Sequence, residues 1–425
     1  MRGALVAAAL TALALTACAP VQSTQQGPVG DERTGTLRVW LFDEANRAAK
    51  ERVVNDAVAE FEAAHPGVRV EVQYIQVDGR AERFRGAFSD PRSAPDVAEF
   101  GNTDLAGYVA AGGFADLTAD LAAWPEATDL TPSVLETAKV DGKVYGVPWF
   151  VGVRALYYRT DVFAELGLQP PRTLTELADT ARTIRAARPD LYGISVGGKY
   201  VYAMLPFVWA SGGDVARQDG GRWTSALEEP ATREGIRRFA ELIRDDNCPP
   251  AQCAQLTGTD SVQLFAAGRS AMTIGGNFNR KAVEAGAVAG KFAVVPLPGD
   301  EPGSVAPAFA GGNLLGVLRS TERRTLAVEF TTLLAGKEYQ RRMFEAMGNL
   351  PTFADVQQQV AGEFERPFVE TLAAGTRFVP VTPGWSKVDA QAVLPTLVQQ
   401  VATGAQSLEE ATRIAAEQMN AAFAD

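Results

Sequence analysis

The sequence predicts an α/β protein with more than one domain, and three observations carry this prediction. A β-rich run at 36–42, an amphipathic helical pattern at 45–64 and an alternating run at 68–75 follow one another, which is a strand–helix–strand order. A second unit of this kind starts at 94–101 (APDVAEFG). Alternating elements indicate a mostly parallel sheet with helices on both faces. The chain has 425 residues, which is too many for one ordinary core.

Residues 1–17 have the pattern of a lipoprotein signal peptide. Arg2 supplies a positive charge, residues 4–15 are apolar, and small residues follow. This apolar run is shorter than the roughly 20 residues that span a bilayer. The stretch Leu15-Thr16-Ala17-Cys18 resembles the bacterial lipoprotein box, in which the cysteine takes a diacylglycerol and becomes the first residue after cleavage. An ordinary signal peptide with an incidental cysteine is the alternative.

A lipid on Cys18 would hold the protein on the outer face of the cell membrane, because two acyl chains anchor a protein stably. Residues 18–36 are rich in Gln, Gly, Ser, Thr and Pro, so we expect them to form a flexible tether. The chain is 46% apolar and has no second long apolar run, so the mature part is expected to be soluble and globular.

Charge and histidine content exclude several classes of function. The formal net charge of −11 becomes −12 once Arg2 is removed, and no Lys/Arg cluster stands out. We therefore expect no nucleic-acid partner. His65 is the single histidine, and it lies before Pro66 where a helix is expected to end. A multi-histidine metal site is thus impossible and a Ser-His-Asp mechanism improbable, and we expect no metal and no cofactor.

Two cysteines remain beside Cys18. Cys248 and Cys253 lie in the stretch DDNCPPAQCAQ. An exported location favours oxidation, and two thiols alone cannot complete a structural zinc site with its usual four ligands. We expect a disulfide that closes a small loop, with two free thiols as the alternative.

The later chain continues the pattern of helices and extended runs. The stretch 146–160 (GVPWFVGVRALYYRT) is extended, and Pro148 inside it favours an edge strand or a crossover between lobes. Thr173 and Glu176 form a capping pattern at the start of a predicted helix at 171–187. Further helices are predicted at 104–111, 203–210, 232–245, 263–267, 323–347 and 391–423, the last with a break near Gly404.

Several segments together resemble the extracellular solute-binding proteins of bacterial ABC carbohydrate importers, the group (family 1) that includes the maltose-binding proteins. Each segment is weakly specific alone, whereas their order and spacing are distinctive, and the resemblance runs from about residue 36 to the C-terminus. The segments are LRVWLFDEAN, APDVAEFGNTD, DGKVYGVPWFVGVRALYYRTDVFAELGL, AAGRSAMTIGGNF, FAGGNLLGV and MGNLPTF.

The resemblance implies a two-lobed α/β fold of the periplasmic-binding-protein kind, with three hinge crossings and the ligand between the lobes. We map the crossings to 147–149, 309–312 and 349–351. Lobe one is then 37–147 with 311–349, and lobe two is 148–310 with 350–425. The implied partners are a carbohydrate and the transmembrane subunits of an ABC permease with a cytoplasmic ATPase. The expected protein is a monomer and not an enzyme.

A sugar site needs flat aromatic surfaces for C–H faces and fixed polar groups for hydroxyls. In open α/β sheets such groups gather on loops at the carboxyl ends of strands. Phe278 follows one candidate in GGNF and belongs to the same loop. The candidate ligand-binding residues are Asp43, Glu44, Asn102, Trp149, Phe150, Arg154, Trp209, Asn277, Gly312, Asn313 and Trp385.

Each candidate also has a structural explanation. The two acids Asp43 and Glu44, and likewise Asn102, could cap the helices that follow them. Trp149 and Trp385 are expected to stack on the ligand, whereas Trp209 could be buried by the helix that ends near Gly212. Arg154 could pair with a neighbouring carboxylate, and Gly312 could serve only the hinge turn.

Two other functions are alternatives to the capture of a sugar. An exported glycosidase would need two carboxylates that flank one bond, and Glu44 with Glu99 is the pair to consider. A metal-binding solute receptor is suggested by Tyr157 and Tyr158, because adjacent tyrosines can ligate ferric iron. In an extended run, however, successive side chains face opposite sides, which favours a structural role for this pair.

The anchor gives the first testable prediction. Cys18→Ala removes the thiol that would carry the lipid, so the protein should appear in the medium or remain unprocessed. Fractionation of cells into membrane and medium, followed by immunoblotting, measures this. Unchanged membrane retention of the variant would contradict the prediction and show that the anchor lies elsewhere.

Overall fold

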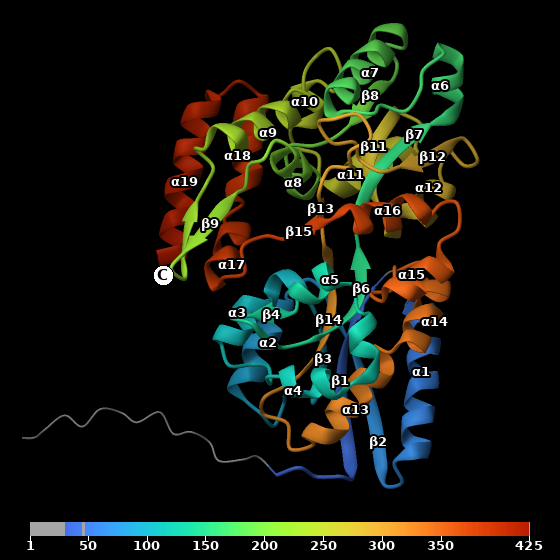
Figure 1. The fold of residues 1–425 in the computed structure, drawn as a ribbon, viewed down its shortest axis with the longest axis vertical. Helices are drawn as coiled ribbons and strands as arrows, with labels where there is room; N and C mark the ends of the chain where they lie inside the picture. Colours follow the sequence, from blue (N-terminus) through green and yellow to red (C-terminus); the bar gives the residue numbers. More distant parts are fainter. Residues whose placement is uncertain (1–29, 45–46, 425) are drawn as a thin grey trace, which may run out of the picture.

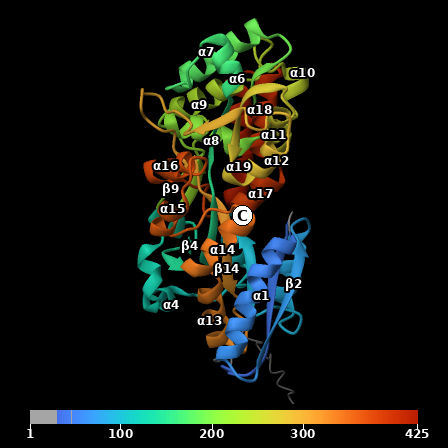
Figure 2. The ribbon, with the colours of Figure 1, turned by 90° about the vertical axis from the view of Figure 1, so that its right-hand side faces the viewer.

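The computed structural model describes residues 30–44 and 47–424. The chain forms two lobes stacked along the long axis, each with its own sheet and surrounding helices (Figure 1), and the view turned by 90° shows the same stacking (Figure 2). The predicted signal peptide, Cys18 and most of the predicted tether lie outside the described residues. Across the described ranges, no helix combines the length and the apolar character that a membrane span requires.

Lobe one contains a five-stranded sheet in the order β2-β1-β3-β14-β6. Its central strand β1 is parallel to β2 and β3, whereas β14 is antiparallel to both β3 and β6. Leu37, Val39 and Leu41 of β1 have no exposed surface, so this strand forms the middle of the core. The strands are β1 (Gly35–Asp43), β2 (Val68–Gln76), β3 (Val97–Gly101), β6 (Val147–Gly152) and β14 (Gly311–Val317).

Helices cover both faces of this sheet, with α1, α13 and α14 on one side and α2 and α3 on the other (Figure 1). Phe61 of α1 meets Phe330 of α13 edge to face, with ring centroids 5.2 Å apart. The elements are α1 (Arg47–Ala64), α2 (Arg80–Ser89), η1 (Asn102–Asp104), α3 (Leu105–Ala110), α4 (Thr118–Ala123), η2 (Pro125–Asp129), α5 (Pro132–Glu136), β4 (Lys139–Val140), β5 (Lys143–Val144), α13 (Arg324–Leu334), α14 (Lys337–Met347) and α15 (Ala354–Val360). The single helix predicted at 323–347 is therefore two helices.

Lobe two contains a four-stranded sheet in the order β12-β7-β11-β8, in which only β11 and β8 are parallel. The strands are β7 (Arg154–Arg159), β8 (Tyr192–Ser195), β11 (Ser270–Gly276) and β12 (Phe292–Val295), with a separate hairpin of β9 (Ala216–Asp219) and β10 (Arg222–Ser225). The prediction of a mostly parallel sheet holds for the three strands on which it was based, β1, β2 and β3, but not for the strands that follow. The strands that begin directly after the first two passages, β7 and β14, run antiparallel to their neighbours.

The helices of lobe two bury a second large core. Phe207 of α8 packs edge to face on Phe239 of α9, with centroids 5.4 Å apart. The helices are α6 (Thr160–Leu166), α7 (Leu174–Ala187), α8 (Val201–Ala210), α9 (Pro230–Ala240), α10 (Pro250–Cys253), α11 (Gly258–Ala266), η3 (Asn277–Asn279), α12 (Arg280–Glu284), α16 (Arg366–Ala374), α17 (Pro383–Ala390), α18 (Val393–Ala402) and α19 (Leu408–Ala424). A small pair of strands, β13 (Ala308–Phe309) and β15 (Thr376–Arg377), lies near the hinge.

The chain passes between the lobes three times, at positions that partly differ from the predicted ones. The first passage is at Val153, because β6 stays paired with β14 as far as Gly152. The second is at Ala310, between β13 and β14, within the predicted 309–312. The third lies at 361–365 rather than 349–351, because α15 still packs on lobe one. Of the described residues, lobe one therefore comprises 30–44, 47–152 and 311–360, and lobe two comprises 154–309 and 361–424.

Buried side chains fasten the strand before the first passage to the segment after α14. The carbonyl of Pro148 accepts hydrogen bonds from Gln340 Nε2 at 3.0 Å and from Thr352 Oγ1 at 3.1 Å. Gln340 Oε1 in turn accepts from the backbone N–H of Thr352 at 2.6 Å. All of these polar groups are buried, where an unpaired donor or acceptor is costly, so this part of the hinge is held in one arrangement.

Residues 31–34, predicted to belong to the flexible tether, instead contact lobe one. The carboxylate of Asp31 accepts from the backbone N–H and the hydroxyl of Thr325, at 2.9 and 2.6 Å. Glu32 pairs with Arg323, and its N–H donates to the carbonyl of Glu322 at 2.7 Å. The composition of this segment predicted flexibility, but its two acids bind residues at the start of α13, so residues 31–34 belong to the folded part of lobe one.

Cys248 and Cys253 form a disulfide whose Cα atoms are 5.8 Å apart. Both residues have no exposed surface and lie in the core of lobe two. Cys253 ends the short helix α10, so the bond closes the turn that leads into this helix. This is the pairing that the sequence suggested.

Candidate functional site

A buried group of charges lies beside the ends of β1 and β3. These strand ends are at the edge of the lobe-one sheet that faces lobe two (Figure 1). The ammonium of Lys50 donates to Glu99 Oε2 at 2.8 Å, to Glu44 Oε2 at 2.7 Å and to the carbonyl of Phe42 at 3.1 Å. Lys50 is 1% exposed and Glu99 0%. Burial lowers the pKa of Lys50, but Glu99 and Glu44 outweigh this effect and raise that pKa above its ordinary value. We call Lys50, Glu99 and Glu44 the charge triad.

Asn313 and Trp149 join this group from the two hinge strands. Asn313 Nδ2 donates to Glu99 Oε1 at 2.6 Å. The Lys50 ammonium lies 5.0 Å from the ring centroid of Trp149, a cation–π contact, and the indole has no exposed surface. Both side chains are therefore engaged in the core of lobe one.

Two predicted ligand-binding asparagines hold the hinge passages. Asn102 is 5% exposed, and its Nδ2 donates to the carbonyl of Ala310 at 2.9 Å. Asn277 Oδ1 accepts from the N–H of Val153 at 3.2 Å, and its Nδ2 donates to the carbonyl of Gly348 at 3.3 Å. Contact of these two asparagines with a ligand stays a prediction. In this structure their side-chain amides are hydrogen-bonded to backbone groups at and near the passages.

Gly312 has a steric role between the hinge strands. A Cβ at this position would lie 2.3 Å from the carbonyl oxygen of Phe150 on the neighbouring strand β6. Only glycine permits this close approach of β14 to β6. Phe150 itself is half-buried, with its ring centroid 5.5 Å from that of Trp149.

An arginine among aromatic rings forms the wall of lobe two that faces lobe one. Arg154 Nε donates to the hydroxyl of Tyr200 at 3.0 Å. Its guanidinium carbon lies 5.1, 5.6 and 5.8 Å from the ring centroids of Tyr202, Tyr200 and Phe278. No ion pair of Arg154 occurs with any carboxylate in the part of the chain that the structure describes. This leaves most of its N–H donors for other partners.

The aromatic wall extends along the second passage. The rings of Tyr202 and Phe309 stack with centroids 4.4 Å apart, and Phe309 stacks on Phe378 at 5.4 Å with 11° between the ring planes. Burial raises the pKa of Tyr202 to about 12, so its hydroxyl is neutral at physiological pH. The wall therefore combines apolar faces with a neutral hydroxyl and a cation.

Phe278 is the large apolar side chain of the described residues that stands exposed, at 48%. Its ring lies against two glycines: a Cβ would meet it at 2.3 Å on Gly276 and at 3.1 Å on Gly152. A cavity of about 300 Å³ opens beside it between the lobes. Lobe two contributes Asn277, Phe278, Arg280, Lys281, Glu284, Phe364 and Glu365 to its lining, and lobe one contributes Phe344, Glu345, Met347 and Gly348.

The lobes also meet at α3 and α17. A Cβ on Gly107 of α3 would lie 3.4 Å from Ser386 Oγ of α17. Arg80 pairs with Asp104 at 2.8 Å on the lobe-one side. Burial raises the pKa of Asp389 on α17, the charge of Asp104 adds to this rise, and Arg80 opposes it. Charged groups of the two lobes therefore interact electrostatically where α3 and α17 meet.

The remaining candidates from the sequence lie in the core or pair with neighbours. Trp385 is 3% exposed within α17, and Trp209 is 3% exposed with its Nε1 donating to Asp214 Oδ1 at 3.2 Å. Trp149, Trp209 and Trp385 are thus all buried in this conformation. Ligand stacking on these indoles stays a prediction, and it would require a movement of the protein that exposes them. Asp43 accepts from Gln76 Nε2 at 2.9 Å.

Four side chains near the site were not singled out from the sequence: Lys50, Tyr200, Tyr202 and Phe378. Lys50 is one of several charged residues in α1, and the pattern did not show that it points inward. Tyr202 and Phe378 lie beside the second passage through contacts distant in sequence, which local patterns do not encode. Tyr157, considered as an iron ligand, is fully buried and donates to the carbonyl of Gly276 at 2.7 Å, a structural role.

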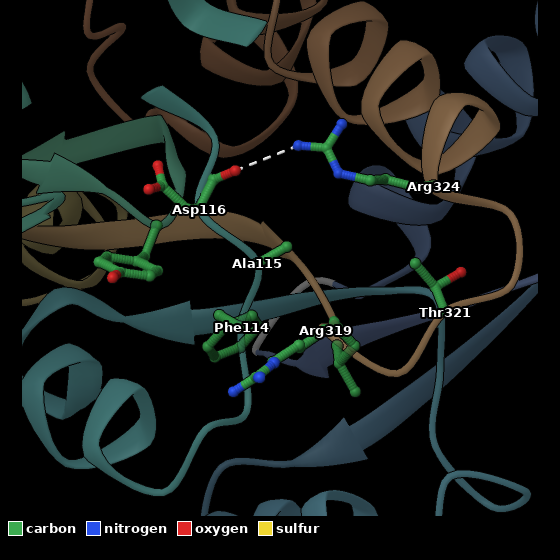
Figure 3. Close-up of a pocket in the computed structure, with 8 residues that line it drawn as sticks. Phe114, Ala115, Asp116, Arg319, Thr321 and Arg324 are labelled. Carbon is green, nitrogen blue, oxygen red and sulfur yellow. Dashed lines mark hydrogen bonds between the residues drawn. The ribbon is translucent and has the colours of Figure 1, made fainter. Parts of the chain in front are cut away.

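A second cavity of about 410 Å³ lies within lobe one, at the end away from lobe two (Figure 3). Its lining includes Phe114, Tyr145 and Arg319. Across its mouth Arg324 donates to the carbonyl of Asp116 at 3.1 Å, and the picture shows this bond. Because a single lobe surrounds this cavity, movement of the lobes would not close over it.

Comparison with known proteins defines the class. The chain belongs to the family of bacterial extracellular solute-binding proteins, whose match covers residues 44–341. This is a family of binding proteins rather than enzymes, so the glycosidase alternative has no support.

Similar proteins span nearly the whole chain. The diacetylchitobiose binding protein DasA of Streptomyces coelicolor is 27% identical over 365 residues, which are 83% of this chain and 82% of that protein. The galactooligosaccharide-binding protein of Bacillus subtilis is 26% identical over 97% of this chain and 96% of its own length. The sugar-binding protein MalE of Xanthomonas citri has the same fold, with a TM-score of 0.81, 23% identity and coverage of 92% and 98%.

The covered indoles give a prediction about stability. Trp149→Ala and Trp385→Ala should each lower the free energy of unfolding by about 3–5 kcal/mol, because each empties a large volume in a packed core. Thermal melting without ligand measures this loss. Trp223→Ala, at a half-buried indole in β10, is the control with a smaller expected effect. Unchanged melting together with a strong loss of sugar affinity would instead assign both indoles to ligand stacking.

Proposed function

We propose that this protein captures a sugar or oligosaccharide between its lobes and delivers it to an ABC import permease. The observation that carries the proposal is the exposed ring of Phe278, which lies beside the first passage, next to Arg154 and an interlobe cavity. Exposed aromatic faces in concave sites are suited to the C–H faces of sugars.

The polar groups around Phe278 suit a ligand rich in hydroxyls. Arg154 uses one N–H on Tyr200 and keeps donors for ligand oxygens. Glu44 offers a carboxylate acceptor from lobe one, and it directly follows Asp43, the last residue of β1. A site with donors on one lobe and acceptors on the other discriminates by closing over the ligand.

The relatives support the same class of ligand. Two similar proteins carry names that specify diacetylchitobiose and galactooligosaccharides, and one similar structure is a cyclo/maltodextrin-binding protein complexed with maltotetraose. Another similar structure is bound with α-D-tagatose, a single sugar unit. These names support a carbohydrate ligand, either a sugar or an oligosaccharide.

The attachment to the cell belongs to the same proposal. Cys18 would carry the lipid that holds the protein on the outer face of the membrane, where the permease receives the ligand. With residues 31–34 bound to lobe one, the chain between the lipid and the folded part would be about a dozen residues, 19–30. We propose that the protein acts as a monomer.

A sugar panel with one variant tests the function. Calorimetry with diacetylchitobiose, a galactooligosaccharide and maltotetraose should find a ligand, and Phe278→Ala should weaken its binding by about 30-fold, or about 2 kcal/mol, because a stacking face is lost. Tyr145→Ala, in the lobe-one cavity, should bind as the wild type. Absence of binding across the panel, or wild-type affinity of Phe278→Ala, would contradict the proposal.

A further inference from the structure

We propose that Lys50 is a positioning residue for ligand binding: its buried ammonium holds the carboxylate of Glu44 at the lobe-facing edge of the sheet, where Glu44 accepts a hydrogen bond from a ligand hydroxyl. This inference rests on the proposed function. It assigns a role to a residue that lies inside the core and that a ligand does not reach.

The geometry fixes Glu44 through one oxygen. An ammonium has three N–H donors, and Lys50 directs them to Phe42 O, Glu99 Oε2 and Glu44 Oε2. The first two acceptors belong to strands β1 and β3, so the third bond ties Glu44 to the rigid sheet. Glu44 Oε1 has no hydrogen-bond partner among the residues that the structure describes, and the side chain is 28% exposed.

Within the charge triad, Glu44 differs in its charge balance from the pair formed by Lys50 and Glu99. Lys50 and Glu99 already neutralise each other, and Glu99 is satisfied by Asn313 Nδ2 and the N–H of Phe42. Glu44 therefore adds a second carboxylate, and with it a net negative charge, beside the buried pair of Lys50 and Glu99. A carboxylate in this situation gains from an external donor, and a sugar hydroxyl is such a donor.

Anchoring matters because a free glutamate side chain has several rotatable bonds. Without Lys50, the side chain of Glu44 would have to be ordered at the moment of binding, and that ordering weakens affinity by about tenfold. With Lys50 in place, the carboxylate is already oriented. A purely structural role for Lys50 would instead affect the stability of lobe one and leave its effect independent of Glu44.

The test compares Lys50→Met in two backgrounds. All variants carry Glu99→Gln, so that Lys50→Met does not leave the Glu99 carboxylate buried and unpaired. In the Glu44→Gln background the Lys50 ammonium keeps only amide and carbonyl acceptors, so the stability of that variant is measured alongside its affinity. Sugar affinity is measured by calorimetry for Glu99→Gln with and without Lys50→Met, first with Glu44 present and then with Glu44→Gln. Circular dichroism and melting confirm that each variant is folded.

We expect Lys50→Met to weaken sugar binding by about tenfold when Glu44 is present and by less than about twofold in the Glu44→Gln background. Equal losses in both backgrounds, or no loss in either, would overturn the positioning role while the proposed function stands. Absence of sugar binding by the wild-type protein would refute the proposed function, and this inference with it.

Discussion

The rest of the structure depends on how the three passages between the lobes keep their backbone polar groups paired. A chain that leaves one sheet and enters another exposes N–H and C=O groups to a buried environment, where unpaired groups are costly. Side-chain amides supply the partners: Asn277 binds the first passage and the carbonyl of Gly348, Asn102 binds the second, and Gln340 binds β6 at Pro148. The lobes are joined by fixed strands, and motion is left to small torsions at the passages.

This hinge places two different walls opposite each other. Lobe one presents the ends of its strands, with the charge triad beneath them. Lobe two presents aromatic rings around Arg154, and the ring of Phe278 lies against Gly276 and Gly152, where a Cβ would contact it at 2.3 and 3.1 Å. In the proposed function, a ligand between the walls would gain apolar contact from one and hydrogen bonds from both, and neither wall alone would enclose it. Closure of the lobes would then be part of binding.

The sequence predicted the fold well because its evidence was distributed along the chain. Alternating elements and the order of six motifs indicated two lobes joined by three passages. The exact passages were harder to predict: β6 remains paired to Gly152, and α15 remains on lobe one, because ladder bonds and helix packing extend beyond the motif. The crossings before β7 and β14 were predicted, but the antiparallel pairing of these two strands was not, because it depends on partners that are distant in sequence.

The site was only partly predictable, since strand ends give location but not orientation. Arg154, Glu44 and Phe278 lie where the sequence placed them, between the lobes. Trp385 was expected in a turn, but Pro383 at the first turn of α17 is also a helix-start signal, and the helix buries the indole. Asn102 and Asn277 have side chains suited equally to a ligand or to backbone, and only the folded chain shows that the passages occupy them.

The central claim is that the ligand enters and leaves through movement of one lobe relative to the other. Gly107→Cys with Ser386→Cys tests it directly, because a Cβ on Gly107 lies 3.4 Å from Ser386 Oγ and a disulfide there would join α3 to α17. Stopped-flow tryptophan fluorescence would follow sugar binding by the oxidised and the reduced protein, with Ser386→Cys alone as the control. The account predicts that the oxidised double variant binds and releases sugar far more slowly and that reduction restores the rates; identical rates in the two redox states would contradict it.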